Sequence, residues 1–256
     1  MAVVVVAGKG GVGKSTVVAG LARILQAHGA EFAVVDADPV GQLGALLGLP
    51  EPQSLAEVLG TGNLDEEGFA LDDVASLLGP LPDGGRLLTM GHAREEGCFC
   101  RTNAVTRAVL VRVLAHTPLV LVDSEAGVEH VTRGTGRHAT RLVLMADEGR
   151  AAFSVAADIL ATVRQLNREG HRRLRGTVHL GVYARTDGAR KTVVETATRC
   201  RLPRPAFVPH SGSLAAASLL GAPVPRYHPD DPFYRALGGW VDRDQLLEVG
   251  GPQGQG

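Results

Sequence analysis

Short apolar runs recur along the chain and alternate with segments whose apolar residues have helical spacing. Seven of the runs have the length and composition of strands, and they predict strands over residues 2–7, 32–38, 86–90, 118–123, 141–146, 177–184 and 206–209. Several are apolar at consecutive positions, which is typical of strands covered on both faces. Between them, the spacing predicts helices over residues 15–28, 103–116, 151–169, 191–200 and 213–220.

This alternation predicts an α/β fold with a single doubly wound, mostly parallel sheet and helices on both of its faces. No linker or internal repeat interrupts it, so we expect one domain over residues 1–249. Residues 50–85 are expected to form a helical insertion, and the glycine-rich stretch 250–256 to be a disordered tail.

Composition narrows the class of protein. The chain has 256 residues and a formal net charge of -1, and no apolar run is long enough to cross a bilayer. Its three cysteines do not make a disulfide framework, so we expect a cytoplasmic protein without a membrane partner. The near-zero charge argues against nucleic acid as the main partner.

Residues 164–204 carry eleven basic and three acidic residues, which fits either a solvated face or a docking surface.

One motif carries clear chemistry. The string "GKGGVGKS" fits the phosphate-loop pattern G-x-x-x-x-G-K-[ST] and lies between a predicted strand and a predicted helix. Its glycines let backbone N–H groups turn towards phosphate oxygens, and the helix adds its positive end. Lys14 is expected to reach the β- and γ-phosphates, Ser15 to bind Mg²⁺ and Thr16 to contact the α-phosphate. The predicted nucleotide contacts in this motif are Gly8, Gly10, Gly11, Val12, Gly13, Lys14, Ser15 and Thr16.

A second lysine in the loop has no role in this pattern. Only three of the 26 basic residues are lysine, and two of them are Lys9 and Lys14, so these positions favour a compact ammonium group over a guanidinium. With Lys9, the loop resembles the deviant Walker A motif K-G-G-x-G-K-[ST] of the MinD/ParA family. The resemblance implies a Mg²⁺-dependent ATPase that forms a homodimer, in which Lys9 contacts the phosphates bound by the partner subunit.

The same resemblance implies roles for acidic residues at the ends of two predicted strands. Asp36 and Asp38 lie in "VVDADP", where Asp38 would orient the attacking water in catalysis and Asp36 would lie in the second shell of Mg²⁺. Asp123 ends "PLVLVD", an apolar strand typical of a Walker B motif, and would hold Mg²⁺ through water. Gly127 would then sense the γ-phosphate. Helix capping by the acids of "VVDADP" is the alternative.

Base recognition departs from the family pattern. Where the family usually has an asparagine after its sixth strand, "GVYARTDG" has Ala184 and Arg185. Pro209 is retained at the last predicted strand, but His210, Ser211 and Gly212 replace the acids of the turn that follows it in the family. ATP is the nucleotide that the resemblance implies, with Pro209 beside the base.

A pair of cysteines, Cys98 and Cys100, has C-x-C spacing. Thiolates bind Zn²⁺ and Ni²⁺, and two pairs across a symmetric dimer would complete a four-sulfur site. The stretches "GCFCRTNAVTRAVL" and "VDSEAGVEHVTRGT" resemble the CooC-type branch of the family, ATPases that help to insert nickel into carbon monoxide dehydrogenase. This implies a client metalloenzyme, with a nucleotide signal carried by Glu125, Glu129 and His130. Cys200 is expected to be a packed residue.

Two other functions fit the sequence. One is a ParA- or MinD-like positioning switch. ParA-like DNA binding would use residues 164–204 as a basic surface, whereas an acidic, glycine-broken C-terminal stretch argues against MinD-like membrane cycling. The other is an adaptor ATPase in which zinc at the cysteines only joins the dimer.

Overall fold

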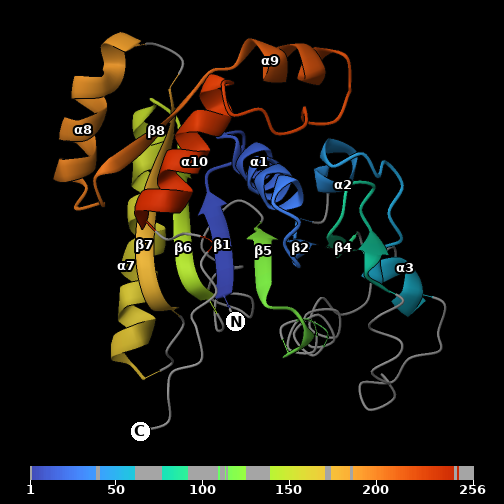
Figure 1. Cartoon of the computed structure of the whole chain (residues 1–256). Helices are drawn as coiled ribbons and strands as arrows, with labels where there is room; N and C mark the ends of the chain where they lie inside the picture. Colours follow the sequence, from blue (N-terminus) through green and yellow to red (C-terminus); the bar gives the residue numbers. More distant parts are fainter. Residues whose placement is uncertain are drawn as a thin grey trace, which may run out of the picture.

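The computed structural model describes residues 2–38, 41–60, 77–91, 109, 113, 115–124, 139–170, 174–184, 187–244 and 247 (Figure 1). Within these residues, one eight-stranded sheet runs through the molecule in the order β3-β4-β2-β5-β1-β6-β7-β8. Neighbouring strands are parallel except for β3, which pairs antiparallel with β4 at one edge. The strands are β1 (Ala2–Gly8), β2 (Ala33–Asp36), β3 (Gly79–Pro80), β4 (Arg86–Thr89), β5 (Leu119–Asp123), β6 (Ala139–Ala146), β7 (Leu174–Ala184) and β8 (Pro205–Pro209).

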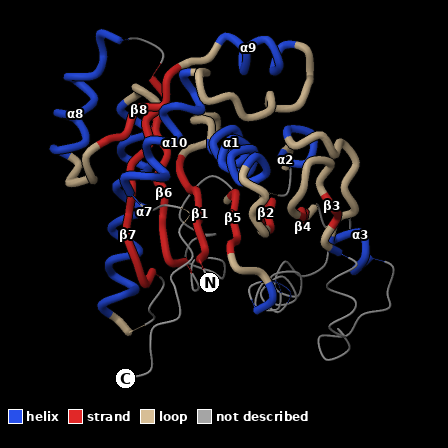
Figure 2. The backbone as a smooth tube through the Cα atoms, viewed as in Figure 1, coloured by secondary structure: helices blue, strands red, loops and turns tan. Residues whose placement is uncertain are grey.

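Helices cover both faces of this sheet, as Figure 2 shows. On one face α1 contacts β5 and α10, and α10 also contacts β8, whereas α7 contacts β1, β6 and α8. This arrangement confirms the predicted doubly wound α/β fold. Among the described helices, none has the length and apolar character that a membrane span requires. The helices are α1 (Lys14–Ala27), α2 (Leu43–Leu46), α3 (Leu55–Gly60), α7 (Arg150–Arg168), α8 (Arg190–Arg199), α9 (Gly212–Leu219) and α10 (Pro232–Asp244), with a 3₁₀ turn at Asp187–Ala189.

All seven predicted strands are present, and their boundaries differ from the predictions by at most three residues. Four of the five predicted helices are present as α1, α7, α8 and α9. Only four residues of the predicted helix 103–116 are described, and all four are helical. The expected insertion contains α3 and then the short strand β3, with residues 61–76 outside the described part. The predicted tail, residues 250–256, also lies outside it.

The C-terminal helix α10 was not predicted, because two consecutive glycines interrupt its sequence. It begins at Pro232, after Asp231, whose carboxylate accepts the N–H of Phe233 at 2.8 Å. Phe233, Leu237 and Trp240 recur at helical spacing and are at most 1% exposed, so this apolar face packs into the core. Burial of that face compensates for the poor helix propensity of the glycines.

The middle strand β1 sets the geometry of the site. Every residue of its sequence "AVVVVAG" is buried, and it pairs with β5 on one side and β6 on the other. In the register of the sheet, Val6 of β1 lies beside Asp123 of β5, and Asp123 lies beside Asp36 of β2. The carboxyl ends of these parallel strands therefore meet at one edge, next to the loop that leads into α1 (Figure 1).

Candidate functional site

The loop between β1 and α1 has the conformation that its glycines allow. A Cβ atom on Gly8 would lie 2.3 Å from the carbonyl oxygen of Met145 on the neighbouring strand. Gly11 and Gly13 have φ of 79° and 87°, in the left-handed region that favours glycine. Gly13 caps the start of α1 without a side-chain hydrogen bond. The first N–H groups of α1 therefore face the loop and can bind an anion.

The two loop lysines have different environments. Lys14 is 7% exposed, and its ammonium group donates to the carbonyl oxygen of Lys9 at 3.4 Å, so its side chain folds over the loop. The Lys9 side chain is exposed. Lys14 is thus placed to neutralise charge inside the loop, whereas Lys9 is accessible to a second molecule. The predicted contact of Lys9 with the nucleotide of a partner subunit stays a prediction.

Two buried carboxylates lie beside this loop. Asp36 and Asp123 are register partners at the ends of β2 and β5, and they are 0% and 1% exposed. Burial raises the pKa of Asp123 to about 7, which a hydrogen bond from Ser15 and the charge of Lys14 partly oppose. Asp36 adds to the increase in the pKa of Asp123, because two neighbouring carboxylates disfavour each other's ionisation.

Asp36 has backbone partners that Asp123 lacks. Its carboxylate accepts the N–H of Asp38 at 3.2 Å and the N–H of Leu43, the first residue of α2, at 3.1 Å. Burial still raises the pKa of Asp36 to about 6. A Cβ on Gly41 would lie 2.1 Å from Asp36 Oδ2, so only glycine lets the loop close around this carboxylate. Asp36 thus accepts the first N–H of α2, although the N-cap residue of that helix is Gln42, and its predicted second-shell role stays a prediction.

One oxygen atom of the two buried carboxylates would favour a bound cation. Asp123 Oδ1 is buried and has no hydrogen-bond partner among the described residues. An unpartnered buried carboxylate oxygen is costly, and a hard cation that accepts oxygen ligands would relieve it. The hydroxyl of Ser15 hydrogen-bonds to the same carboxylate, so both groups are within reach of one ion. This donor set fits Mg²⁺.

Several predicted site residues lie outside the described part of the chain: Gly127, Glu125, Glu129, His130, Cys98 and Cys100. Asp38 is described and half-buried, two residues after the end of β2. Cys200 is half-buried and packs against the core, which confirms the interpretation given from the sequence. In the described ranges, no three His, Cys, Asp or Glu side chains form a cluster that would hold a metal ion.

A cavity of about 690 Å³ opens beside the start of α1. Its walls come from the ends of β7 and β8, from α9 and from the segment after α9. Tyr183 and His210 face it, and their ring centroids are 6.5 Å apart at an angle of 79°. Its lining residues are Thr16, Leu46, Tyr183, His210, Leu214, Ala215, Ala217, Ser218, Leu219, Ala222 and Val224.

Two residues that line the cavity lie at the strand ends where the sequence departs from the family pattern of base recognition. His210, one residue after β8, is part of that departure, whereas Tyr183, one residue before the end of β7, was not predicted to lie at the site. Pro209 ends β8 next to it, and its contact with a base stays a prediction. An aromatic residue at the carboxyl end of a parallel strand, close to a phosphate loop, is the signal that would have found Tyr183.

Comparison with known proteins agrees with this architecture. Residues 3–224 match the CobQ/CobB/MinD/ParA nucleotide binding domain. The chain is 34% identical over 183 residues to the carbon monoxide dehydrogenase accessory protein CooC of Rhodospirillum rubrum, a match that covers 64% of this chain and 69% of the relative.

Solved structures show the same fold at low sequence identity. A ParA family ATPase from Chlorobium tepidum has a TM-score of 0.72 at 19% identity, covering 94% of this chain and 97% of that one. The septum site-determining protein MinD from Pyrococcus horikoshii, complexed with Mg-ADP, has a TM-score of 0.68 at 16% identity, covering 95% of this chain and 97% of that one. With its phosphate loop, buried carboxylates and sheet order, the chain belongs to the CobQ/CobB/MinD/ParA nucleotide-binding family and is an ATPase.

Proposed function

We propose that this ATPase uses a nucleotide-dependent dimer to drive the insertion of nickel into a client metalloenzyme in the cytoplasm. The observation that carries the proposal is the 34% identity to CooC, a carbon monoxide dehydrogenase accessory protein. The C-x-C pair adds a chemical reason, because two thiolates per subunit suit a soft or borderline metal. Carbon monoxide dehydrogenase, or an enzyme with a similar centre, is the client that we infer.

The phosphate loop supplies the first step, the binding of ATP. Backbone N–H groups from Gly10 to Ser15 surround the β- and γ-phosphates, and Thr16 contacts the α-phosphate. Lys14 moves its ammonium group from the carbonyl oxygen of Lys9 to a phosphate oxygen, since a charged acceptor is the stronger partner. The base enters the adjacent cavity, where Tyr183 offers a ring on which adenine can stack.

The carboxylates supply the second step. Ser15 and Asp123 would hold Mg²⁺, which supplies charge neutralisation for the transferred phosphoryl group when it is bound. Asp38 follows β2 at the edge of the loop and orients the attacking water. Positioning and electrostatic stabilisation thus carry the hydrolysis, and no covalent intermediate with the protein is required.

Lys9 would connect the binding of ATP to the formation of the dimer. Its exposed ammonium group is available to the phosphates of a second copy, so ATP would become part of the dimer contact. Dimerisation brings together two Cys98–Cys100 pairs, and four thiolates then bind one divalent ion that is passed to the client. Hydrolysis weakens the contact of Lys9 and changes the geometry of the shared metal site.

Equilibrium titration with Zn²⁺ and Ni²⁺ tests the metal step. We expect one ion per dimer, thiolate-to-metal charge-transfer absorption with Ni²⁺, and weaker binding as pH falls because the thiols must be deprotonated. The double variant Cys98→Ala with Cys100→Ala should lose tight binding and keep nucleotide binding. Cys200→Ala is the matched control, because this thiol packs against the core, and it should bind metal like the parent. One ion per monomer, or unchanged affinity in the double variant, would contradict the shared site.

Lys9→Ala tests the dimer step separately. Light scattering with ATP and Mg²⁺ should show a parent dimer and a monomeric variant, while the nucleotide affinity of the variant stays within about threefold of the parent. A variant that dimerises with ATP as the parent does would remove Lys9 from the contact.

A second candidate function is a ParA-like partitioning switch. Seven basic residues on or near α7 and α8 are exposed and would supply a surface for DNA: Arg164, Arg168, Arg190, Lys191, Arg199, Arg201 and Arg204. A salt-dependent gel shift with ATP favours this function if binding is tight at physiological salt, and metal insertion if it is not. MinD-like membrane cycling through α10 is disfavoured, because the apolar face of this helix is buried in the core.

A further inference from the structure

A short segment after α9, residues 222–226, closes one side of the cavity, and we call it the strap. Ala222 and Val224 line the cavity, and Pro223 and Pro225 flank Val224. Prolines fix φ and lack an N–H group, so the strap is stiff and few of its groups can tie it to the protein. The Val224 side chain is 4% exposed, and its N–H donates to the Leu46 carbonyl at 2.8 Å.

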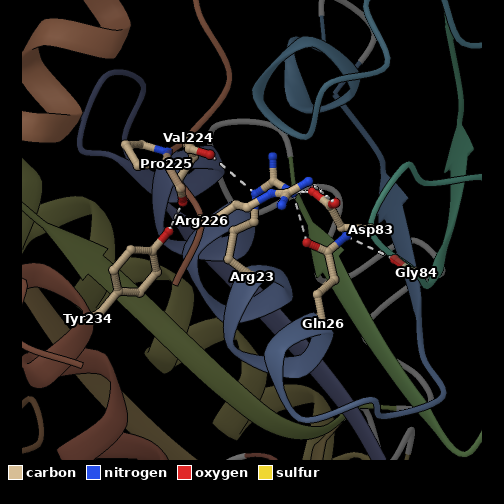
Figure 3. Close-up of polar contacts among 8 residues, drawn as sticks. All are labelled: Arg23, Gln26, Asp83, Gly84, Val224, Pro225, Arg226 and Tyr234. Carbon is tan, nitrogen blue, oxygen red and sulfur yellow. Dashed lines mark hydrogen bonds and ion pairs between the residues drawn. The ribbon is translucent and has the colours of Figure 1, made fainter. Parts of the chain in front are cut away.

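Arg23 of α1 holds the other backbone group of Val224. Its Nε donates to the Val224 carbonyl oxygen at 3.2 Å, and its NH1 forms an ion pair of 2.7 Å with Asp83 Oδ2 (Figure 3). The same NH1 donates to Gln26 Oε1 at 2.9 Å. The Arg23 side chain is only 5% exposed, and a buried guanidinium without partners would be strongly unfavourable. Both backbone groups of Val224 are therefore fixed, one by α2 and one by α1.

Asp83 connects Arg23 to the strap a second time. Its Oδ1 accepts from NH2 of Arg226 at 2.6 Å, so one carboxylate bridges an arginine of α1 and an arginine of the strap (Figure 3). The Tyr234 hydroxyl of α10 donates to the Pro225 carbonyl oxygen. Arg23, Asp83 and Arg226 together form what we call the clamp.

The clamp and the phosphate-binding end lie on the same helix. Arg23 follows Thr16 by seven residues, which places the two side chains on one face of α1, two turns apart. Thr16 lines the cavity, and Arg23 fixes the strap, which forms another part of its wall. Helix α1 therefore connects the phosphate loop at its N-terminal end to the strap in the wall of the cavity.

We propose that the clamp positions the strap as the wall against which the nucleotide base packs, so that it sets affinity for the base without affecting the phosphates. Arg23 and Asp83 are positioning residues in this proposal, since they act through Val224 and Arg226 of the strap. The inference rests on the proposed function, because it takes the cavity to be the site of the base. A purely stabilising network would instead affect all ligands of the folded protein equally.

Arg23→Lys tests the proposal by calorimetric titration with Mg-ATP and with Mg-triphosphate, which has no base. Lysine keeps the charge beside Asp83 but lacks the forked guanidinium, so the bond to the Val224 carbonyl is lost. We expect Kd for ATP to rise about 10-fold or more, the effect of one hydrogen bond to a charged group, with an unchanged Kd for triphosphate. If this variant does not fold, Arg226→Ala, which changes an 82% exposed side chain, should raise Kd for ATP about twofold by loosening the same strap.

Gln26→Ala is the matched control. It removes the bonds of Gln26 to Arg23 and to the Gly84 carbonyl, at 2.9 Å each, but leaves the strap bond intact. It should lower Tm without changing either Kd. An equal rise of both Kd values in Arg23→Lys, or the same loss of ATP affinity in Gln26→Ala, would overturn the clamp. If the parent binds triphosphate as tightly as ATP, the cavity is not the base site. If the parent prefers ATP and the Arg23→Lys variant keeps this preference, the base site stands and only the clamp is overturned.

Discussion

Replacing Asp123 by asparagine should stabilise the nucleotide-free protein at alkaline pH. The pKa of Asp123 rises from its ordinary value of 3.8 to about 7 on folding, because the carboxylate is buried beside Asp36. Between these values the folded state binds more protons than the unfolded state, so the free energy of unfolding decreases as pH rises through this window. Stability from the protonated group is fully present below pH 3.8 and is lost above about pH 7.

The size of the effect follows from the same shift. At 1.36 kcal/mol per pKa unit, the rise to about 7 corresponds to about 4 kcal/mol of unfavourable free energy in the ionised folded protein. Asparagine keeps the shape and removes the charge, but its amide protons need acceptors, so we expect a gain of about 2 kcal/mol at pH 8. For a domain of this size the gain raises Tm by about 4–8 °C.

Calorimetric unfolding in EDTA, at pH 8 and at pH 5, measures this difference. The gain of Asp123→Asn should be present at pH 8 and lost at pH 5, because about two of the three pKa units of this window, or about 3 kcal/mol, lie above pH 5. Asp158→Asn, a change on the exposed face of α7, is the control and should leave Tm unchanged at both pH values. A gain of equal size at both pH values, or a lower Tm at pH 8, would refute the electrostatic argument.

Other substitutions test separate parts of the structure. Lys14→Ala should abolish detectable nucleotide binding in calorimetric titration, because it removes the buried ammonium group of the phosphate loop; binding at parental affinity would contradict this role. Asp38→Ala should bind Mg-ATP, release phosphate at least about 100-fold more slowly and accumulate as a dimer, as measured by phosphate release and light scattering; normal turnover would exclude Asp38 from hydrolysis. Gly20→Ala should lower the free energy of unfolding by about 1–3 kcal/mol, because its Cβ would lie 2.5 Å from Phe233 Cε1. Gly238→Ala in α10 meets no atom within 4 Å and should raise it by about 0.5–1 kcal/mol, so calorimetry of this pair should show opposite signs.

The sequence predicted what depends on local patterns. The strand runs and the phosphate loop are contiguous, and parallel pairing places the ends of β2 and β5 together, so the approach of Asp36 and Asp123 follows from two separate motifs. Their raised pKa values do not follow, because burial depends on packing of the whole site. Arg23 was also beyond prediction, since its partners Asp83 and Val224 are 60 and 201 residues away in the chain.

The packing of α10 on α1 has a consequence for how the chain is made. Gly20 of α1 lies against Phe233 and Leu237, so α1 is covered by a helix that is synthesised much later. Contacts of such long sequence separation form late and slow the folding of a domain. A nascent chain that has been translated only as far as α9 contains the phosphate loop, but it lacks the strap and leaves this face of α1 bare. Tight ATP binding should therefore appear only after residue 240 has left the ribosome, long after the phosphate loop has emerged.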